Sequence, residues 1–363
     1  MAQANSLIFL PDISGFTNFV SSTESEHSQH IIAELLELLI DNEELDLTLS
    51  DIEGDAIFYY KYKSVPTQEE LFNQVKKMFV NFHSHLKLYE ERRICQCGAC
   101  CSASELNLKF FAHAGEMDFI KIKEDKKPYG QDVIVAHRLM KNDVPIDDYL
   151  LVSQGVFDAW GVDVVSIPIE LEGIKGHTEY DLGRVDYQYF KLNPFRKYAK
   201  LPNPVKTIIS TDPVIKISET IKKAPQDLFE LVSNLDHRLK FNTDVDGFKY
   251  QKDRVNRVGT KHTCVVNNKN IEFETVTNND FGKDKLVYGE LTHDFPIIKD
   301  MATFFVIEPE GEQSKITIEA HPQNPSFLSK IALFFLKGIL ARSTKSLIKN
   351  LKSEAEKEQL IMQ

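Results

Sequence analysis

The chain has 363 residues, of which 42% are hydrophobic and 27% are charged, and its formal net charge is −11. This length predicts two to three domains, and the composition is that of a folded globular chain rather than a disordered one. The negative charge argues against a nucleic-acid partner, and none is expected.

Several features bear on location. Residues 1–14 lack the charged start of a signal peptide. The longest apolar stretch, residues 327–341, is interrupted by Lys330 and Lys337 and is shorter than the ~20 residues of a membrane-spanning helix. Most of the five cysteines crowd into residues 95–101, unlike a disulfide framework. We therefore expect a cytoplasmic protein.

The first half of the chain alternates strands and helices. Apolar residues at helical spacing predict helices at 30–40, 69–89 and 131–140. Short apolar runs predict strands at 6–10, 47–49, 56–62, 106–111 and 117–122. The second and third of these strands flank a polar turn and should pair, as should the last two. This order of elements predicts an α+β domain with helices packed on one sheet.

A cluster of prolines between residues 192 and 213 predicts a linker, because proline removes backbone donors and favours extended chain. We therefore expect a first domain at 1–192, a linker at 193–213 and a second domain at 214–363. The second domain should begin with a strand at 214–221 and a helix at 225–235. Antiparallel strands and a long helix at 326–356 should follow, with an apolar cavity between sheet and helix.

Two acids in the first half stand next to predicted strands. Asp12 follows an apolar strand and precedes a glycine turn, and Asp55 lies at the tip of the expected hairpin. Two carboxylates at one edge of a sheet can hold Mg²⁺. The alternative is that Asp12 caps a helix and Asp55 is an ordinary turn residue.

The surrounding motifs resemble those of class III adenylyl and guanylyl cyclases. The sequence FLPDISGFT is similar to their first metal-binding strand, and DIEGDAIFYY is similar to their second metal-binding hairpin. Residues 129–139 resemble the helix that completes the site from the partner subunit, and FAHAG, LLVS and LEG resemble further strands. The match runs through residues 5–192 in the same order. It implies a ferredoxin-like, cyclase-type fold.

The resemblance also implies roles for single residues. Asp12 and Asp55, with the Ile13 backbone, would bind two Mg²⁺ or Mn²⁺ ions that polarise a nucleoside triphosphate. Arg138 would stabilise charge in the transition state from the partner chain, which implies a homodimer formed through this domain.

The chain departs from the cyclase pattern at several positions. Ile134 stands where active cyclases have an asparagine, and Asp51 and Lys127 stand at the two nucleobase-contacting positions. Glu172 replaces a phosphate-binding lysine, although Lys175 is close enough to substitute. Each lost contact could cost ~2–4 kcal/mol of barrier. Slow, altered or absent turnover is therefore expected.

Four cysteines, Cys95, Cys97, Cys100 and Cys101, lie between a predicted helix and a predicted strand. They could bind Zn²⁺, with His83 or His85 as a further ligand, or they could form a redox switch. Their spacing is not a standard zinc motif, so a reduced cluster without a ligand is the alternative.

The order of elements in the second half is similar to that of START-like domains, of the polyketide cyclase and Bet v 1 type, which grip one long helix in a curved sheet. That resemblance implies a small apolar ligand in the cavity. The helix at 327–341 is apolar on nearly every side and needs a cover. Docking to a membrane surface is a minor alternative.

Three functions follow from these interpretations. The first is a sensor, in which the START-like domain binds an apolar ligand and the cyclase-like domain responds through nucleotide binding or dimer rearrangement. The second is an active but divergent homodimeric nucleotidyl cyclase. The third is an interaction module in which both pockets are lost.

Overall fold

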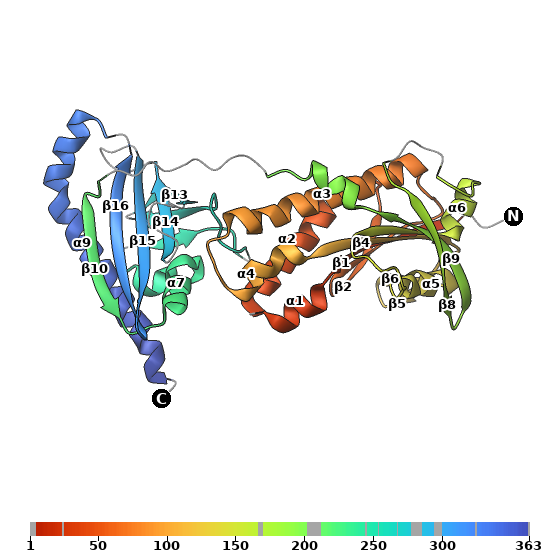
Figure 1. Ribbon diagram of the computed structural model, residues 1–363, viewed down its shortest axis with the longest axis horizontal. Helices are drawn as coiled ribbons and strands as arrows, with labels where there is room; N and C mark the ends of the chain where they lie inside the picture. Colours follow the sequence, from red (N-terminus) through yellow and green to blue (C-terminus); the bar gives the residue numbers. More distant parts are fainter. Residues whose placement is uncertain are drawn as a thin grey trace. The chain divides into compact units, whose positions relative to one another are not determined.

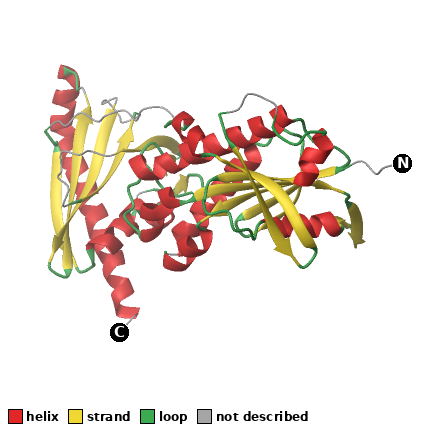
Figure 2. Cartoon of the chain, turned by 45° about the vertical axis from the view of Figure 1, so that its right-hand side comes forward, coloured by secondary structure: helices red, strands yellow, loops and turns green. Residues whose placement is uncertain are grey.

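The computed structural model describes residues 5–23, 25–165, 170–201, 212–243, 245–252, 254–266, 268–276, 285–293, 300–323 and 325–361. Residues 202–211 of the expected linker therefore lie outside the described residues. The chain divides into two compact units: unit 1 is Met1–Lys87 with Ser102–Pro202, and unit 2 is Leu88–Cys101 with Asn203–Gln363. Each unit contains a seven-stranded sheet with helices packed on it (Figure 1, Figure 2), which confirms the expected mixture of helices and sheets.

The sheet of unit 1 has the strand order β2-β3-β1-β4-β7-β9-β8. Only β4 and β7 are parallel neighbours; the other neighbours are antiparallel. The strands are β1 (Ser6–Ser14), β2 (Thr48–Glu53), β3 (Ala56–Lys61), β4 (Asn107–Gly115), β7 (Tyr149–Ser153), β8 (Gly173–Tyr180) and β9 (Gly183–Lys191). The helical segments are α1 (Phe16–Ser22), α2 (Ser25–Asp41), α3 (Gln68–Arg92), η1 (Ala103–Glu105), α5 (Gln131–Leu139), α6 (Gln154–Trp160) and η2 (Asn193–Tyr198).

Helices cover both faces of this sheet. On one face, Ile8 and Leu10 of β1 form a core cluster with Val133, Ala136 and Leu139 of α5. On the other face lies α3, where Phe72 meets Phe190 of β9 with ring centroids 5.0 Å apart. Because successive side chains of a strand alternate between faces, the residues of β1 with even numbers, Asp12 among them, lie on the α5 face.

One expected pairing was wrong. The strand predicted at 117–122 does not pair with β4. Instead β5 (Asp118–Ile122) pairs with β6 (Asp125–Tyr129) in a separate two-stranded sheet. The tight turn between them contains Lys123 with a φ of 56°, a left-handed conformation that favours glycine. The turn therefore carries no glycine to mark it in the sequence.

The sheet of unit 2 is antiparallel throughout, with the order β10-β16-β15-β14-β13-β12-β11. Its strands are β10 (Ile215–Ile221), β11 (Gly247–Lys249), β12 (Lys261–Val266), β13 (Lys269–Val276), β14 (Leu286–Thr292), β15 (Asp300–Glu310) and β16 (Gln313–Gln323). The helical segments are α7 (Pro225–Ser233), η3 (Leu235–His237), α8 (Arg238–Phe241) and the long α9 (Phe327–Ile361).

Helix α9 runs along this sheet (Figure 1). Its C-terminal half buries Ile348, Leu351 and Ala355 in one cluster with residues of α7 and of the sheet. Its N-terminal half leaves Phe334 77% and Phe335 74% exposed. Among the described residues, none of the helices is long and apolar enough to cross a membrane.

The segment that carries the cysteines is built into unit 2. Ile94 is buried in the same cluster as α7 and α9. Arg93 forms a β-bridge with Arg257, and the Val258 N–H donates to the Arg92 carbonyl at 2.9 Å. The short helix α4 (Gly98–Ser102) follows.

Candidate functional site

Asp12 lies near the end of β1 between two neighbouring strands. Its Cα is in register with Ala56 on β3 and with Lys109 on β4. The strand is apolar from Leu7 to Leu10, which explains why this part of the chain enters the centre of the sheet. It also explains why Asp12 is half-buried.

Asp55 reaches the same place from the β2–β3 turn. Gly54 has a φ of +70° there, which the tight turn requires. The Ile13 N–H donates to the Asp55 carbonyl at 3.1 Å, so the backbone of the turn is joined directly to the end of β1. The two acids predicted as metal ligands and the predicted Ile13 backbone are therefore brought together.

The two carboxylates influence each other electrostatically. Burial, with the nearby charge of Asp55, raises the pKa of Asp12 from 3.8 to about 6. Burial also raises the pKa of Asp55. A half-buried pair of acids with raised pKa values favours either a proton or a cation between them. Hard carboxylate oxygens suit Mg²⁺ or Mn²⁺, so the donors fit the expected ions.

A lysine accompanies the two acids, and the sequence analysis missed it. The charge of Lys109 on β4 offsets part of the rise in the pKa values of Asp12 and Asp55. Its Nζ lies 3.6 Å from Asp147 Oδ1 and 5.8 Å from the centre of the Tyr149 ring. One cation thus partly balances the two acids. The sequence offered one indication of this residue, because Lys109 is a charged residue within a mostly apolar predicted strand.

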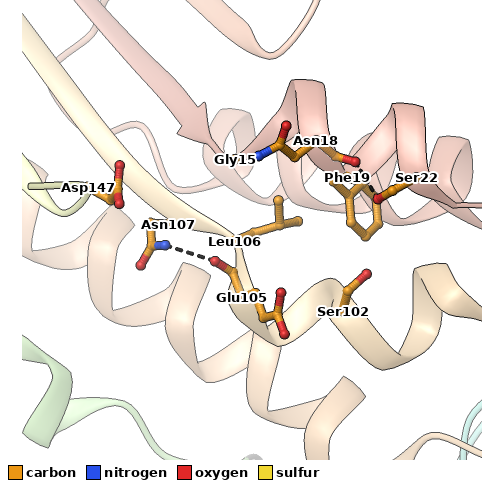
Figure 3. Close-up of a pocket in the computed structure, with 9 residues that line it drawn as sticks. All are labelled: Gly15, Asn18, Phe19, Ser22, Ser102, Glu105, Leu106, Asn107 and Asp147. Carbon is orange, nitrogen blue, oxygen red and sulfur yellow. Dashed lines mark hydrogen bonds between the residues drawn. The ribbon is translucent and has the colours of Figure 1, made fainter.

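A pocket of about 410 Å³ opens beside these residues (Figure 3). Asp147 lines this pocket and also contacts Lys109. The Ser14 hydroxyl donates to the Asp147 carboxylate at 3.0 Å. The nine residues that line it include two acids, Glu105 and Asp147, and no base. Such a lining suits cations or hydroxyl groups better than bare phosphates.

The two predicted nucleobase positions also meet. Lys127 of β6 donates to Asp51 of β2 at 2.8 Å and to the Ser50 carbonyl at 3.1 Å. This hydrogen bond lowers the pKa of Asp51 and raises that of Lys127. Both side chains are exposed, so the pair can open to other partners at little cost.

The two cationic residues predicted to act on the phosphates have other neighbours within one chain. Arg138 of α5 contacts Asp181 at 3.2 Å, and Lys175 of β8 is exposed opposite Gln188 of β9. Within the described part of one chain, neither contacts Asp12 or Asp55. Ile134, at the asparagine position, is 49% exposed on α5.

Two histidines named as zinc ligands have other partners. His83 lies 3.4 Å from Asp148, which also accepts hydrogen bonds from Arg196 and from the Leu108 N–H. His85 contacts the buried Glu34 at 2.8 Å. These contacts connect helices and strands within unit 1 and give both histidines a structural role.

The structure brings three of the four clustered cysteines to one point. The sulfur atoms of Cys95, Cys97 and Cys100 lie within 4.8 Å of one another. The Cys101 thiol instead donates to the Gln96 carbonyl at 3.5 Å. Cys264 is buried separately on β12.

Unit 2 contains a buried charged network that no sequence signal revealed. The Arg238 guanidinium donates to Glu290, which also accepts from Tyr288 at 2.6 Å and lies 3.3 Å from His262. Although burial raises the pKa of Glu290, the positive charge of Arg238 outweighs it and holds that pKa well below its usual range. The guanidinium lies 5.2 Å from the centre of the Phe305 ring.

Comparisons with other proteins connect this chain to uncharacterised relatives. A family model described as a protein of unknown function (DUF2652) matches residues 32–149. An uncharacterised protein of Mycobacterium tuberculosis is 32% identical over 125 residues, which are 34% of this chain. The chain spans 58% of that relative's length, less than two thirds.

Solved structures similar to the chain include cyclase domains. The guanylate cyclase domain of RhGC from Catenaria anguillulae, in complex with GTP, is 14% identical, with 52% of this chain and 97% of that one covered and a TM-score of 0.35. The adenylyl cyclase CyaB of P. aeruginosa is 14% identical, with 51% and 93% covered and a TM-score of 0.33. At such low identities and TM-scores, no conclusion about activity rests on these likenesses.

Proposed function

We propose that unit 1 is a divergent cyclase-homology domain that binds a divalent cation, Mg²⁺ or Mn²⁺, together with a nucleoside triphosphate. The observation that carries this proposal is the convergence of Asp12 and Asp55, joined through the Ile13 backbone. The cation would bind between the two carboxylates and neutralise phosphate oxygens. The Asp51–Lys127 pair would open to contact the nucleobase.

Turnover is the weaker part of the cyclase interpretation. Ile134 cannot hydrogen-bond a ribose, Arg138 pairs with Asp181, and Lys175 is exposed on β8. Catalysis would therefore need a homodimer in which the partner supplies Arg138. We favour a sensor or regulator over an active nucleotidyl cyclase for this reason.

The test is calorimetric titration of the full chain with Mn²⁺ and then with each of the four nucleoside triphosphates, with chromatography of the products. We expect Mn²⁺-dependent binding of at least one nucleotide, and its loss in the Asp12→Asn/Asp55→Asn variant. Asp118→Asn, which changes an exposed acid of β5, is the matched control and should bind normally. A cyclic product that depends on Asp12 and Asp55 would establish the active cyclase instead. No binding of Mn²⁺ or of any nucleotide would overturn both.

For unit 2 we propose a START-like domain that binds a small apolar ligand. An antiparallel sheet with one long helix along it, and a deeply buried Arg238–Glu290 pair among aromatic rings, support this proposal. In a ligand-binding domain of this kind, the buried pair would give an otherwise apolar molecule a fixed polar anchor. Mass spectrometry of solvent extracts of the purified chain should find one co-purified apolar compound, and its amount should fall in Glu290→Gln. A chain that carries and takes up no apolar compound would leave unit 2 as an interaction module.

A further inference from the structure

The cysteine segment of unit 2 has the arrangement of a soft-metal site. Three sulfur atoms, from Cys95, Cys97 and Cys100, lie within 4.8 Å of one another. Zinc binds thiolates at about 2.3 Å, which places two sulfurs of a tetrahedral site about 3.8 Å apart. The observed separations therefore need to close by no more than about 1 Å around an ion of this size.

The backbone of the segment already points donors at the sulfurs. The Cys97 N–H donates to Cys95 Sγ at 3.4 Å, and the Cys100 N–H donates to Cys97 Sγ at 3.5 Å. Hydrogen bonds from the surroundings hold metal ligands in orientation and stabilise negative charge on them. These hydrogen bonds hold the sulfur atoms of the turn close to one another.

The residues before the cysteines are anchored in the core of unit 2. Ile94, next to Cys95, is buried in the core of unit 2, and the Arg93–Arg257 bridge fixes the preceding residue. Beyond the sulfurs, Glu230 of α7 lies 3.7 Å from Cys95 Sγ. Cys95 and Cys100 are buried, and all five cysteines of the chain are thiols rather than halves of disulfides.

We propose that Cys95, Cys97 and Cys100 bind one Zn²⁺ ion within unit 2. Three thiolates select a soft or borderline ion over Mg²⁺ or Ca²⁺, and zinc is the common ion for tetrahedral sites rich in sulfur. The ion closes the turn after α3, next to Glu230 of α7. This proposal is independent of the nucleotide site in unit 1.

The neighbouring Cys101 supplies the matched control. Its thiol donates to the Gln96 carbonyl and takes no part in the group of three sulfurs. Cys101→Ser therefore removes a thiol from the same short helix without removing a ligand. A redox pair would behave differently, because Cys97 and Cys100 would form a disulfide on mild oxidation and Cys95 would not be needed.

The experiment measures bound metal in the purified full chain by mass spectrometry of the elements. We expect about one zinc per chain in the wild type and in Cys101→Ser, and its loss in Cys95→Ser, Cys97→Ser and Cys100→Ser. X-ray absorption should find three sulfur ligands with one nitrogen or oxygen. Replacement by Co²⁺ should give the intense visible bands of tetrahedral thiolate coordination, even in a ligand variant of Asp12 and Asp55.

Three results would overturn the proposal. The first is a wild-type chain that neither carries zinc nor takes up Co²⁺ after full reduction. The second is equal loss of metal in Cys101→Ser and Cys97→Ser. The third is a Cys97–Cys100 disulfide in the isolated chain, which would make the segment a redox pair.

Discussion

Replacing Asp12 by asparagine should stabilise unit 1 at neutral pH. The pKa of this acid is about 6 in the folded chain, compared with 3.8 for an ordinary aspartate. A raised pKa means that the folded state holds its proton more tightly than the unfolded state does. The free energy of unfolding therefore falls as the pH rises from about 4 to about 6, and it stays low above that range.

The size of the effect follows from the pKa values. Each pH unit between the folded and unfolded pKa corresponds to about 1.4 kcal/mol, so two units correspond to about 3 kcal/mol. Asp12→Asn removes the charge and keeps the shape, and it should be more stable than the wild type by up to about 3 kcal/mol at pH 7.5 without divalent cations. The two chains should differ little at pH 4.

Urea unfolding followed by tryptophan fluorescence is the assay. The chain has one tryptophan, Trp160 of α6, which lies in unit 1 and donates to the Pro66 carbonyl at 2.7 Å. Adding Mn²⁺ at 100 times its dissociation constant should stabilise the wild type by about 2.7 kcal/mol and leave Asp12→Asn nearly unchanged. An Asp12→Asn chain that is less stable at pH 7.5, or that keeps the wild-type loss of stability between pH 4 and 6, would refute the reasoning.

Three further changes test other parts of the structure. Burial raises the pKa of Asp148, but its contacts with His83, Leu108 and Arg196 outweigh burial and lower that pKa. The stabilisation is therefore present above pH 4 and is lost as the pH falls through the lowered pKa. Asp148→Asn should cost about 2–3 kcal/mol in urea unfolding at pH 7 and less as the pH falls below 4. In Gly115→Ala the new Cβ would meet the Asp132 carboxylate at 2.2–2.6 Å, and thermal unfolding should show a loss of about 1–3 kcal/mol. Glu290→Gln leaves the buried Arg238 without its charged partner, and calorimetry should show unit 2 destabilised by about 3–5 kcal/mol. If any of the three variants is as stable as the wild type, the contact from which its effect was predicted does not contribute to stability.

The sequence located most elements of unit 1 because their periodicity is clear. The predicted helices 69–89 and 131–140 correspond closely to α3 and α5, since each buries one apolar face. The β5–β6 hairpin was missed because its turn is formed by Lys123 and its neighbours rather than by glycine or asparagine. Local sequence patterns therefore predicted the positions of the helices and strands. They did not predict that β5 pairs with β6, because the turn between these strands has no residue typical of turns.

The site was predicted only where a motif marked it. Asp12 and Asp55 each follow or join a strand, and their motifs resemble known ones, so they could be named in advance. Lys109 comes near Asp12 only because β4 lies beside β1 in the folded sheet, and Asp147 joins them through its contacts with Lys109 and Ser14. The contact of His83 with Asp148 joins residues 65 positions apart along the chain, which no local pattern reports.

The two proposed metal sites differ in the hardness of their ligands, and this separates their ions. Carboxylate oxygens at Asp12 and Asp55 prefer Mg²⁺ or Mn²⁺, whereas the three thiolates of the cysteine group prefer Zn²⁺. A strong zinc chelator should therefore destabilise unit 2 and leave Mn²⁺ binding by unit 1 intact. In unit 1, stability and function are linked. Repulsion between the two carboxylates destabilises the folded state. A cation bound between them offsets this repulsion, which explains why the fold can keep both acids.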